Sequence, residues 1–190
     1  MLVAGTTTLL DHIRRDAGAD AWTELVRRYW RVVFGYARRS GLNPADAEDF
    51  TQEILTELVR VVPNLELDPE RGTFRSILFT IVRRRLIDRY RAPQPHAALP
   101  ELLDLREVEQ PDAPWEQEWQ RSLLRLALDE AARAVEPRTY QAFQLVVLDG
   151  WTAKQVAAFL DLSVDSVYQA KARVLRHARE VVERVEGEEA

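Results

Sequence analysis

The sequence contains no cysteine and only three histidines in 190 residues. The missing cysteines exclude disulfide bonds, thiolate zinc sites and thiol nucleophiles, and three scattered histidines are a poor basis for a metal site. No apolar run approaches the roughly 18 residues that a membrane-spanning helix requires, and the first residues lack the charged-then-apolar pattern of a secretion signal. We therefore expect a soluble, cytoplasmic protein that has no membrane insertion and needs neither a metal nor a cofactor.

Alternation of apolar and polar residues, which marks a half-buried strand, is also missing. Apolar residues recur instead at spacings of three and four almost throughout, as they do in amphipathic helices. They make up 46% of the chain, enough for the core of one medium domain or of two small ones. The sequence therefore predicts an all-α fold, with Val26, Val59 and Leu175 among the residues expected to face a core.

Capping residues and prolines divide this pattern into segments. Asn43 before Pro44 is a strong helix start, and Thr73, Thr152 and Ser163 are expected to cap three further helices. The expected helices span about 8–17, 21–39, 43–62, 73–91, 115–135, 137–148, 152–160 and 163–185. The segment 93–114 holds five prolines and is acidic, which favours a linker. We expect two small helical domains, 1–92 and 115–190, joined by this acidic linker.

The net charge of −5 conceals blocks of opposite sign. Residues 71–91 hold seven arginines against one acid, a balance of +6, whereas 93–120 hold seven acids against one arginine, a balance of −6. Residues 163–179 carry +3 and residues 180–190 carry −4. Because the local charge decides what a surface attracts, the pattern indicates two DNA-facing elements joined and followed by acidic segments.

The segment 151–179 has the spacing of a helix-turn-helix motif, with a short capped helix, a tight turn and a longer capped helix. Gln and Arg side chains on the second helix can form bidentate contacts with adenine and guanine, whereas Ser and Lys suit bases or phosphates. The alternative is a helical hairpin with a solvated basic face. The predicted DNA-binding residues are Ser163, Ser166, Gln169, Lys171, Arg173 and Arg176.

The helix expected over 73–91 carries a second basic face. Its predicted outer residues are Arg75, Thr80, Arg83, Arg84, Arg85, Arg89 and Arg91. One helix cannot neutralise so many arginines internally, so a polyanion is the expected partner. The alternative is that these arginines pair with the acidic linker. Phe74, Phe79 and Tyr90 either stack on unpaired bases or, as is favoured for each ring, belong to the core.

The run 46–53 places several acids at the start of a helix. Asp46 and Glu48 complement the positive end of the helix dipole, which explains them without a function. Asp49, Gln52 and Glu53 are not explained in this way, and their spacing of three and four puts them together on the exposed side. We expect a polar docking face there. A carboxylate metal cluster is the alternative, but neither a nearby histidine nor a second acidic cluster completes a cage.

Three motifs in this order carry a family resemblance. They are Asp46-Ala47-Glu48-Asp49-Phe50-Thr51-Gln52-Glu53, then Phe74-Arg75-Ser76-Ile77-Leu78 with Leu86-Ile87-Asp88, and then Trp151-Thr152-Ala153-Lys154-Gln155-Val156-Ala157. Together they resemble the extracytoplasmic-function group of bacterial sigma factors, over about residues 9–179. The sequence departs from the common pattern at Ile77 and Arg84, where relatives often have Trp and Asn, and at Tyr168 and Ala170, where Lys and Arg are frequent.

The resemblance implies a transcription initiation factor without catalytic residues of its own. The first domain would bind the clamp helices of the largest catalytic subunit of RNA polymerase through Asp49, Gln52 and Glu53. Its arginine-rich helix would recognise and open the minus-ten promoter element, with an exposed base held near the loop 63–73. The second domain would read the minus-thirty-five element and meet the polymerase flap. The linker would run toward the RNA exit path, and an anti-sigma factor or another regulator would be a further partner.

Two other functions stay open at the level of sequence. One is a polymerase-independent helix-turn-helix regulator whose first domain dimerises or senses a signal. The other is a helical enzyme that uses the acids of the run 46–53 with a divalent metal. Internal neutralisation of the arginines on 73–91, or burial of the surroundings of Asp49, would contradict the interpretation as a sigma factor.

Overall fold

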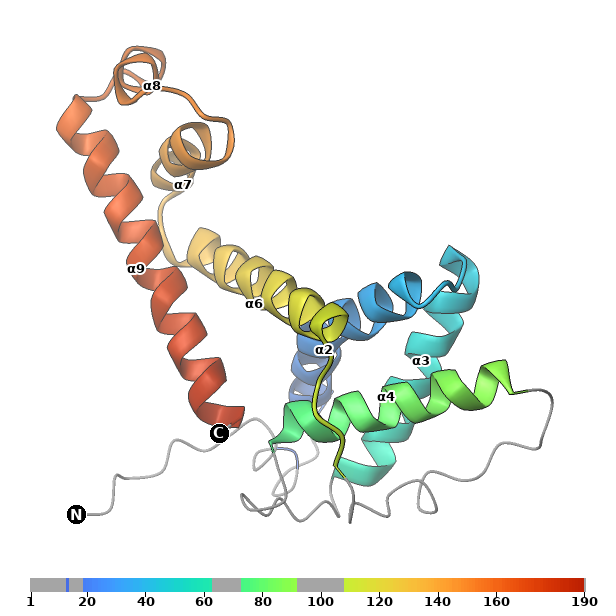
Figure 1. Cartoon of the computed structure of the whole chain (residues 1–190). Coiled ribbons are helices and arrows are strands. Elements are labelled where there is room, and N and C mark those ends of the chain that lie inside the picture. Colours follow the sequence, from blue (N-terminus) through green and yellow to red (C-terminus); the bar gives the residue numbers. More distant parts are fainter. Residues whose placement is uncertain (1–12, 14–18, 63–72, 92–107, 190) are drawn as a thin grey trace. The chain divides into compact units, whose positions relative to one another are not determined.

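The computed structural model describes residue 13 and the segments 19–62, 73–91 and 108–189 (Figure 1). These segments contain helices and no strand, so the predicted all-α fold is confirmed. The elements are α2 (Ala19–Arg39), α3 (Pro44–Val61), α4 (Phe74–Tyr90), α6 (Ala113–Ala134), α7 (Pro137–Phe143), the short π-helix η2 (Gln144–Leu148), α8 (Ala153–Leu160) and α9 (Val164–Glu189). The chain forms two units, Met1–Ser122 with Gly187–Ala190, and Leu123–Glu186.

Local side-chain contacts fix the starts of the helices where the sequence predicts them. Asn43 accepts a hydrogen bond from the backbone N–H of Asp46 at 2.9 Å, directly before Pro44 begins α3. Thr73 caps α4 in the same way, and Thr152 forms a complete capping box at the start of α8. Each cap satisfies a backbone N–H that the first helical turn leaves without a partner. The chain entries to α3, α4 and α8 are therefore encoded locally.

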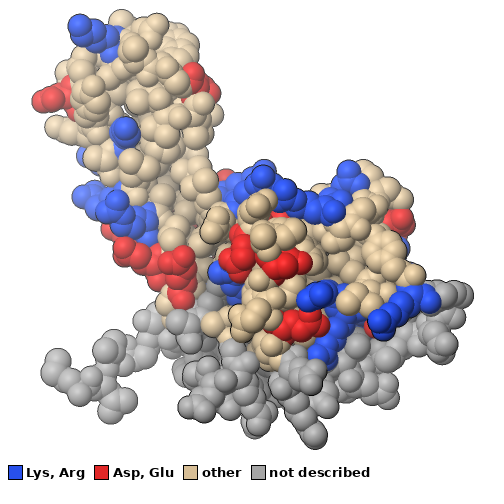
Figure 2. Space-filling view, viewed as in Figure 1, with Lys and Arg blue, Asp and Glu red and all other residues tan. Residues whose placement is uncertain are grey.

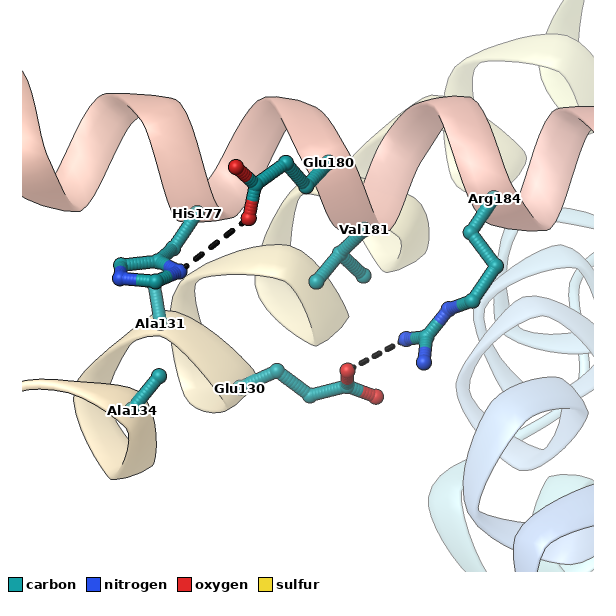
Figure 3. Close-up of a pocket in the computed structure, with 7 residues that line it drawn as sticks. All are labelled: Glu130, Ala131, Ala134, His177, Glu180, Val181 and Arg184. Atoms are coloured by element: carbon teal, nitrogen blue, oxygen red, sulfur yellow. Dashed lines mark hydrogen bonds and ion pairs between the residues drawn. The ribbon is translucent and has the colours of Figure 1, made fainter.

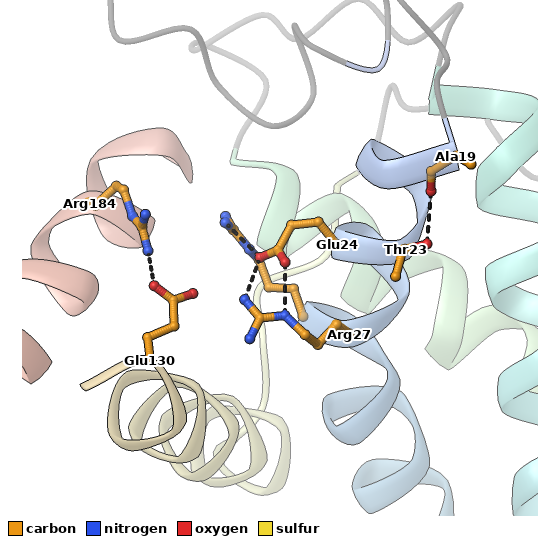
Figure 4. A network of polar contacts seen from close by, with 7 residues as sticks. Ala19, Thr23, Glu24, Arg27, Glu130 and Arg184 are labelled. Carbon is orange, nitrogen blue, oxygen red and sulfur yellow. Dashed lines mark hydrogen bonds and ion pairs between the residues drawn. The ribbon is translucent and has the colours of Figure 1, made fainter. Parts of the chain in front are cut away.

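The first turns of α2 are also held by local contacts. Thr23 donates a hydrogen bond to the carbonyl of Ala19 at 2.8 Å, and Glu24 accepts two from Arg27 at 2.8 and 3.0 Å (Figure 4). Arg28 reaches the same carboxylate at 3.4 Å. Such pairs three and four residues apart each stabilise a helix by about 0.2–0.5 kcal/mol.

The core of the first unit is built around α4. The inward-facing residues of α4 include Phe74, Ile77, Leu78, Phe79, Thr80, Ile81, Val82 and Leu86, which go almost completely around the first half of the helix. A helix buried in this way needs cover on more than one side. Apolar side chains of α2 and α3 belong to the same cluster, and so does Ile13.

Two tryptophans at the start of α6 belong to this first core. The ring of Trp115 lies 5.3 Å from Tyr36 and 5.4 Å from Phe79, and Trp119 lies 5.8 Å from Tyr29, all between centroids. The division between the units therefore falls inside α6, between Ser122 and Leu123, rather than before Trp115 as expected. Helical spacing identifies an apolar face but not the core against which that face packs.

The second unit uses the rest of α6 together with α7, η2, α8 and α9. Leu126, Ala127 and Ala131 of α6 pack in one cluster with Val174 and Ala178 of α9. A second cluster lies beneath the helix-turn-helix motif and contains Ala142, Val156, Ala157, Leu160, Val167 and Ala170. Gly150, with φ of 75°, follows the π-helix η2 and provides the left-handed conformation that ends the helical segment α7–η2.

Three apolar residues do not lie where the sequence predicts them. Val26, Val59 and Leu175 are 36%, 37% and 41% exposed. Each sits at the edge of the apolar stripe of its helix. In α9 the buried row runs through Val167, Ala170, Val174, Ala178, Val181 and Val185, so the small side chain of Ala170 faces the core and Leu175 does not.

None of the helices in the described segments combines the length and the hydrophobicity that crossing a membrane requires. The same segments bring together no group of three or more histidine, aspartate or glutamate side chains in a position to bind a metal ion.

Candidate nucleic-acid interface

The helix-turn-helix motif of the second unit is formed by α8, a turn at Asp161 and Leu162, and α9. Asp161 has a left-handed backbone with φ of 51°. The guanidinium of Arg138, on α7, donates hydrogen bonds to the carbonyl of Leu160 and, at 3.3 Å, to that of Asp161. Arg138 thus fixes the turn from a neighbouring helix. The sequence does not predict this role of Arg138, because only the folded chain brings α7 beside the turn.

The predicted reading residues gather at the N-terminal half of α9. Ser163 caps the helix by accepting a hydrogen bond from the backbone N–H of Ser166 at 3.0 Å, and the two hydroxyl groups lie 2.8 Å apart. Gln169, Arg173 and Arg176 are exposed, and spacings of four and three place them on one face. Lys171 and Ser166 are half-buried at the flanks.

The exposed arginines of this face are not neutralised by neighbouring carboxylates among the described residues. Within the part of the chain that the structure describes, neither Arg173 nor Arg176 forms an ion pair. Both side chains are exposed, so their donors are available to an incoming anion. The exposed Ala172 and Tyr168 lie on the same side and add an apolar contribution to the face.

The arginines of α4 have a different environment. Five of the six predicted on its outer face pair with carboxylates of the same unit. Their partners are Glu116 for Arg75, Glu109 for Arg83 and for Arg84 at 3.9 Å, Glu57 for Arg85, and Asp46 for Arg89 at 3.5 Å. The alternative that these arginines pair with the acidic linker therefore holds for Arg83 and Arg84, whereas Arg75, Arg85 and Arg89 pair with acids outside the predicted linker. The carboxylates come from α3, α6 and the end of the predicted linker. The charge balance of the α4 segment alone therefore does not reveal them.

Figure 2 shows the effect of this pairing on the surface. On the face drawn there, acidic side chains of the first unit lie between the basic ones, and they interrupt the basic surface that the sequence predicts. Arg91, at the end of α4, is exposed.

Thr80 is buried, although the sequence predicts it on the outer face of α4. It is 1% exposed, donates a hydrogen bond to the carbonyl of Ser76 at 2.8 Å and accepts one from the backbone N–H of Glu109 at 2.9 Å. A hydroxyl buried in this way does not reach DNA in the free chain. Phe74 and Phe79 are buried as well, so these two rings belong to the core. Tyr90 is 59% exposed, and its hydroxyl donates to the carbonyl of Ser40 at 2.7 Å.

The predicted docking residues Asp49, Gln52 and Glu53 are exposed together on α3. With Thr56 and Glu57 they line a wide, shallow hollow of 450 Å³. The surroundings of Asp49 are thus open to a partner. Amide and carboxylate groups at this spacing suit basic and hydrogen-bonding side chains of another protein.

A buried tyrosine connects α2 to the segment before α6. Tyr36 donates a hydrogen bond from its hydroxyl to the carboxylate of Asp112 at 2.8 Å. Burial, followed by this hydrogen bond, raises the pKa of Tyr36 above its ordinary value, so the phenol keeps its proton. The other oxygen of Asp112 accepts the backbone N–H of Trp115 at 2.9 Å and caps α6.

A second hollow, of 270 Å³, lies between α6 and the C-terminal half of α9 (Figure 3). Glu130 and Arg184 pair across it at 2.5 Å, and His177 pairs with Glu180 at 3.2 Å. Both carboxylates of the hollow therefore have partners within the second unit. The predicted reading residues occupy the other half of α9.

Three sequence predictions fall outside the described residues. They are the helix expected over 8–17, apart from Ile13, the base-binding loop at 63–72, apart from Thr73, and residues 93–107 of the acidic linker. The last residues of the predicted linker, from Val108, are described, and they belong to the first unit.

Comparisons with known proteins agree with this two-part architecture. The family described as Sigma-70 region 2 matches residues 25–94, and the one described as Sigma-70, region 4 matches residues 125–177. The extracytoplasmic-function (ECF) RNA polymerase sigma factor SigE of Mycolicibacterium smegmatis is 31% identical over 163 residues, which cover 85% of this chain and 61% of SigE. The ferric citrate uptake sigma factor FecI of Escherichia coli is 33% identical over 132 residues, covering 70% of this chain and 73% of FecI. With both regions present in order and a relative aligned over most of its length, the chain belongs to the extracytoplasmic-function sigma factors of bacterial RNA polymerase.

Proposed function

We propose that this chain binds core RNA polymerase and directs it to start transcription at specific promoters. The observation that carries this proposal is the exposed face of α9, where Gln169, Arg173 and Arg176 stand together on the second helix of a helix-turn-helix motif. Family membership supplies the partner, because region 2 and region 4 are parts of sigma factors. The chain contributes recognition, and the polymerase contributes the chemistry.

The second unit would read the minus-thirty-five element. A recognition helix lies in the major groove with its N-terminal residues at the base edges. Gln169 and Arg173 would contact adenine or guanine, with Arg176, Lys171, Ser163 and Ser166 at bases or phosphates. Each good bidentate contact discriminates against the wrong base by about 1–3 kcal/mol.

The first unit would hold the polymerase and the minus-ten element. Asp49, Gln52 and Glu53 would dock on the clamp helices of the largest subunit, which is supported by their joint exposure on α3. Arg83, Arg84, Arg89 and Arg91 of α4 would meet the promoter backbone after exchanging their carboxylate partners for phosphates. Arg75 and Arg85 would have to make the same exchange, and the side chain of Arg85, which is 11% exposed, is the most deeply covered of the paired arginines of α4.

Two coupled assays test the function. The purified chain should retain core polymerase on a column at low salt and direct run-off transcription from its promoter. Asp49→Ala combined with Gln52→Ala should weaken retention, whereas Glu183→Ala, an exposed acid on α9, serves as a control for lost negative charge and should not. A wild-type chain that fails to bind core polymerase at low salt would overturn the proposal.

A gel-shift assay with and without core polymerase distinguishes a sigma factor from a polymerase-independent regulator. The sigma factor should bind promoter DNA poorly by itself and tightly with core, whereas an independent regulator should bind a symmetric operator unaided. An anti-sigma factor or another regulator is proposed from family membership alone.

A further inference from the structure

The segment 108–122 lies outside both matched regions, which end at residue 94 and begin again at residue 125. It nevertheless belongs to the first unit. Three kinds of contact attach it there: the hydrogen bond from Tyr36 to Asp112, the bond from the backbone N–H of Glu109 to Thr80, and the burial of Trp115 and Trp119. The segment 108–122 is therefore held in place on the first unit by these contacts.

Two carboxylates of the segment 108–122 pair with arginines of α4. Glu109 pairs with Arg83 and, at 3.9 Å, with Arg84. One helical turn into α6, Glu116 pairs with Arg75, whose guanidinium also lies 4.9 Å from the ring centre of Trp119. Three of the basic groups offered by α4 to a polyanion are thus occupied by acids of the same chain.

We propose that residues 108–116 are a built-in competitor for nucleic acid at α4, whose Glu109 and Glu116 occupy the phosphate-binding positions of Arg75, Arg83 and Arg84 in the free chain. This inference rests on the proposed function, in which α4 binds promoter DNA. A phosphate must displace a carboxylate to reach these guanidinium groups, and the two acids also cancel part of the local positive potential.

The anchoring makes the competition effective. The two acids belong to a segment that is held in place by buried groups. After a pair opens, the acid therefore meets its arginine again at a high effective concentration. The ion pairs themselves are partly exposed to solvent, because the side chains of Arg83 and Glu109 are 45% and 29% exposed. Ion pairs of this kind are individually weak, so a polyanion that contacts several arginines at once can displace them. Only the acid side chains need to move, while Trp115 and Trp119 stay in place.

The competitor predicts a particular behaviour of the free protein. DNA binding through α4 should be weak until core polymerase or a correctly opened promoter adds contacts of its own. Displacement of the acids is then part of promoter engagement. The free chain is thereby prevented from binding nucleic acids nonspecifically through its most basic helix.

The test measures binding of the full chain to a fluorescein-labelled single-stranded oligonucleotide by anisotropy at several salt concentrations. The double variant Glu109→Gln with Glu116→Gln keeps both side-chain sizes and the backbone bond to Thr80 but removes the two charges. Its affinity should rise about threefold to tenfold at low salt, as expected for two partly exposed ion pairs. Its salt dependence should steepen, because more arginines then release counterions from the DNA.

Matched variants separate this effect from a general change of charge. Asp20→Asn with Glu48→Gln removes two exposed acids of the first unit and should produce little of this gain in affinity. Adding Arg83→Ala with Arg84→Ala to the double variant should abolish the gain. Thermal unfolding followed by circular dichroism checks that the two glutamine substitutions leave the fold intact.

The outcomes distinguish the inference from the function beneath it. If the glutamine variant binds no more tightly than wild type, or gains only as much as the control variant at Asp20 and Glu48, the competitor is overturned. An effect of Arg83→Ala with Arg84→Ala on promoter opening would still support DNA binding by α4. If the arginine substitutions change neither DNA binding nor promoter opening in any background, the proposed role of α4 fails and the competitor fails with it.

Discussion

Replacement of Trp115 by alanine is expected to destabilise the first unit strongly. The side chain is 0% exposed and packs against Tyr36, Phe79 and Trp119. Truncation of a buried aromatic side chain to alanine costs about 3–5 kcal/mol, because transfer free energy is lost and a cavity remains. Domains are stable by only about 5–15 kcal/mol, so the expected loss is a large share of the total.

A second substitution at the same position sharpens the prediction. The indole Nε1 of Trp115 has no hydrogen-bond acceptor among the described residues, although it is buried. A buried donor without an acceptor costs about 1–3 kcal/mol. Trp115→Phe keeps an aromatic ring and removes this donor, so it should reduce the free energy of unfolding clearly less than Trp115→Ala.

Urea unfolding of the full chain, followed by far-ultraviolet circular dichroism, measures both effects. Trp151→Ala is the matched control, because Trp151 is 39% exposed in the second unit and its loss should cost below about 1 kcal/mol. The reasoning would be refuted if Trp115→Ala cost no more than Trp151→Ala. The start of α6 would then contribute nothing to the first core.

Three further outcomes are expected. Gln169→Ala or Arg173→Ala should weaken use of the minus-thirty-five element by about 1–3 kcal/mol in transcription assays on single-base promoter variants; an equal loss on every variant would indicate a phosphate contact instead. Asp49→Ala with Gln52→Ala should lower the affinity for core polymerase while leaving the melting temperature unchanged, since both side chains are exposed; unchanged affinity in a fluorescence titration would move the docking site elsewhere. The pKa of Tyr36 is raised above its ordinary value of 10.0 by burial and by Asp112, so the stability that its proton confers is complete below pH 10.0 and is lost as the pH rises further. Tyr36→Phe should therefore unfold with less dependence on alkaline pH, and identical pH profiles in urea titrations would contradict this.

The pairing of the α4 arginines changes which observation supports the function most directly. At the level of sequence, internal neutralisation counted against a promoter-binding role. The structure contains this neutralisation, yet the pairs are mostly accessible to solvent, and such pairs contribute only about 0–1 kcal/mol each. They compete with phosphates without excluding them. The unpaired face of α9 is therefore the stronger structural support for DNA binding.

The sequence predicted what is encoded locally. Asn43, Thr73 and Thr152 carry their capping partners within three residues, so the starts of α3, α4 and α8 followed from the sequence alone. The exposed position of Gln52 on α3 followed from helical spacing in the same way.

The features that the sequence did not predict depend on contacts between distant segments. Trp115 fits a helical stripe, but spacing does not reveal that its core lies with Tyr36, 79 residues earlier in the chain. Glu109 lies in a segment with the composition of a linker, yet its backbone and side chain are both bound to α4. Arg138 stabilises the turn of the helix-turn-helix motif from a helix that the motif itself does not include.

The tryptophans of α6 have a practical consequence for dissecting or exchanging parts of such proteins. A shortened chain that stops where the first family match ends keeps α2, α3 and α4, but it leaves the rings of Tyr29, Tyr36 and Phe79 without their cover. Exposed aromatic surface of this kind promotes aggregation. A transplanted first unit should therefore include its own residues through Ser122, because Trp115 and Trp119, which cover those rings, lie downstream of the first family match.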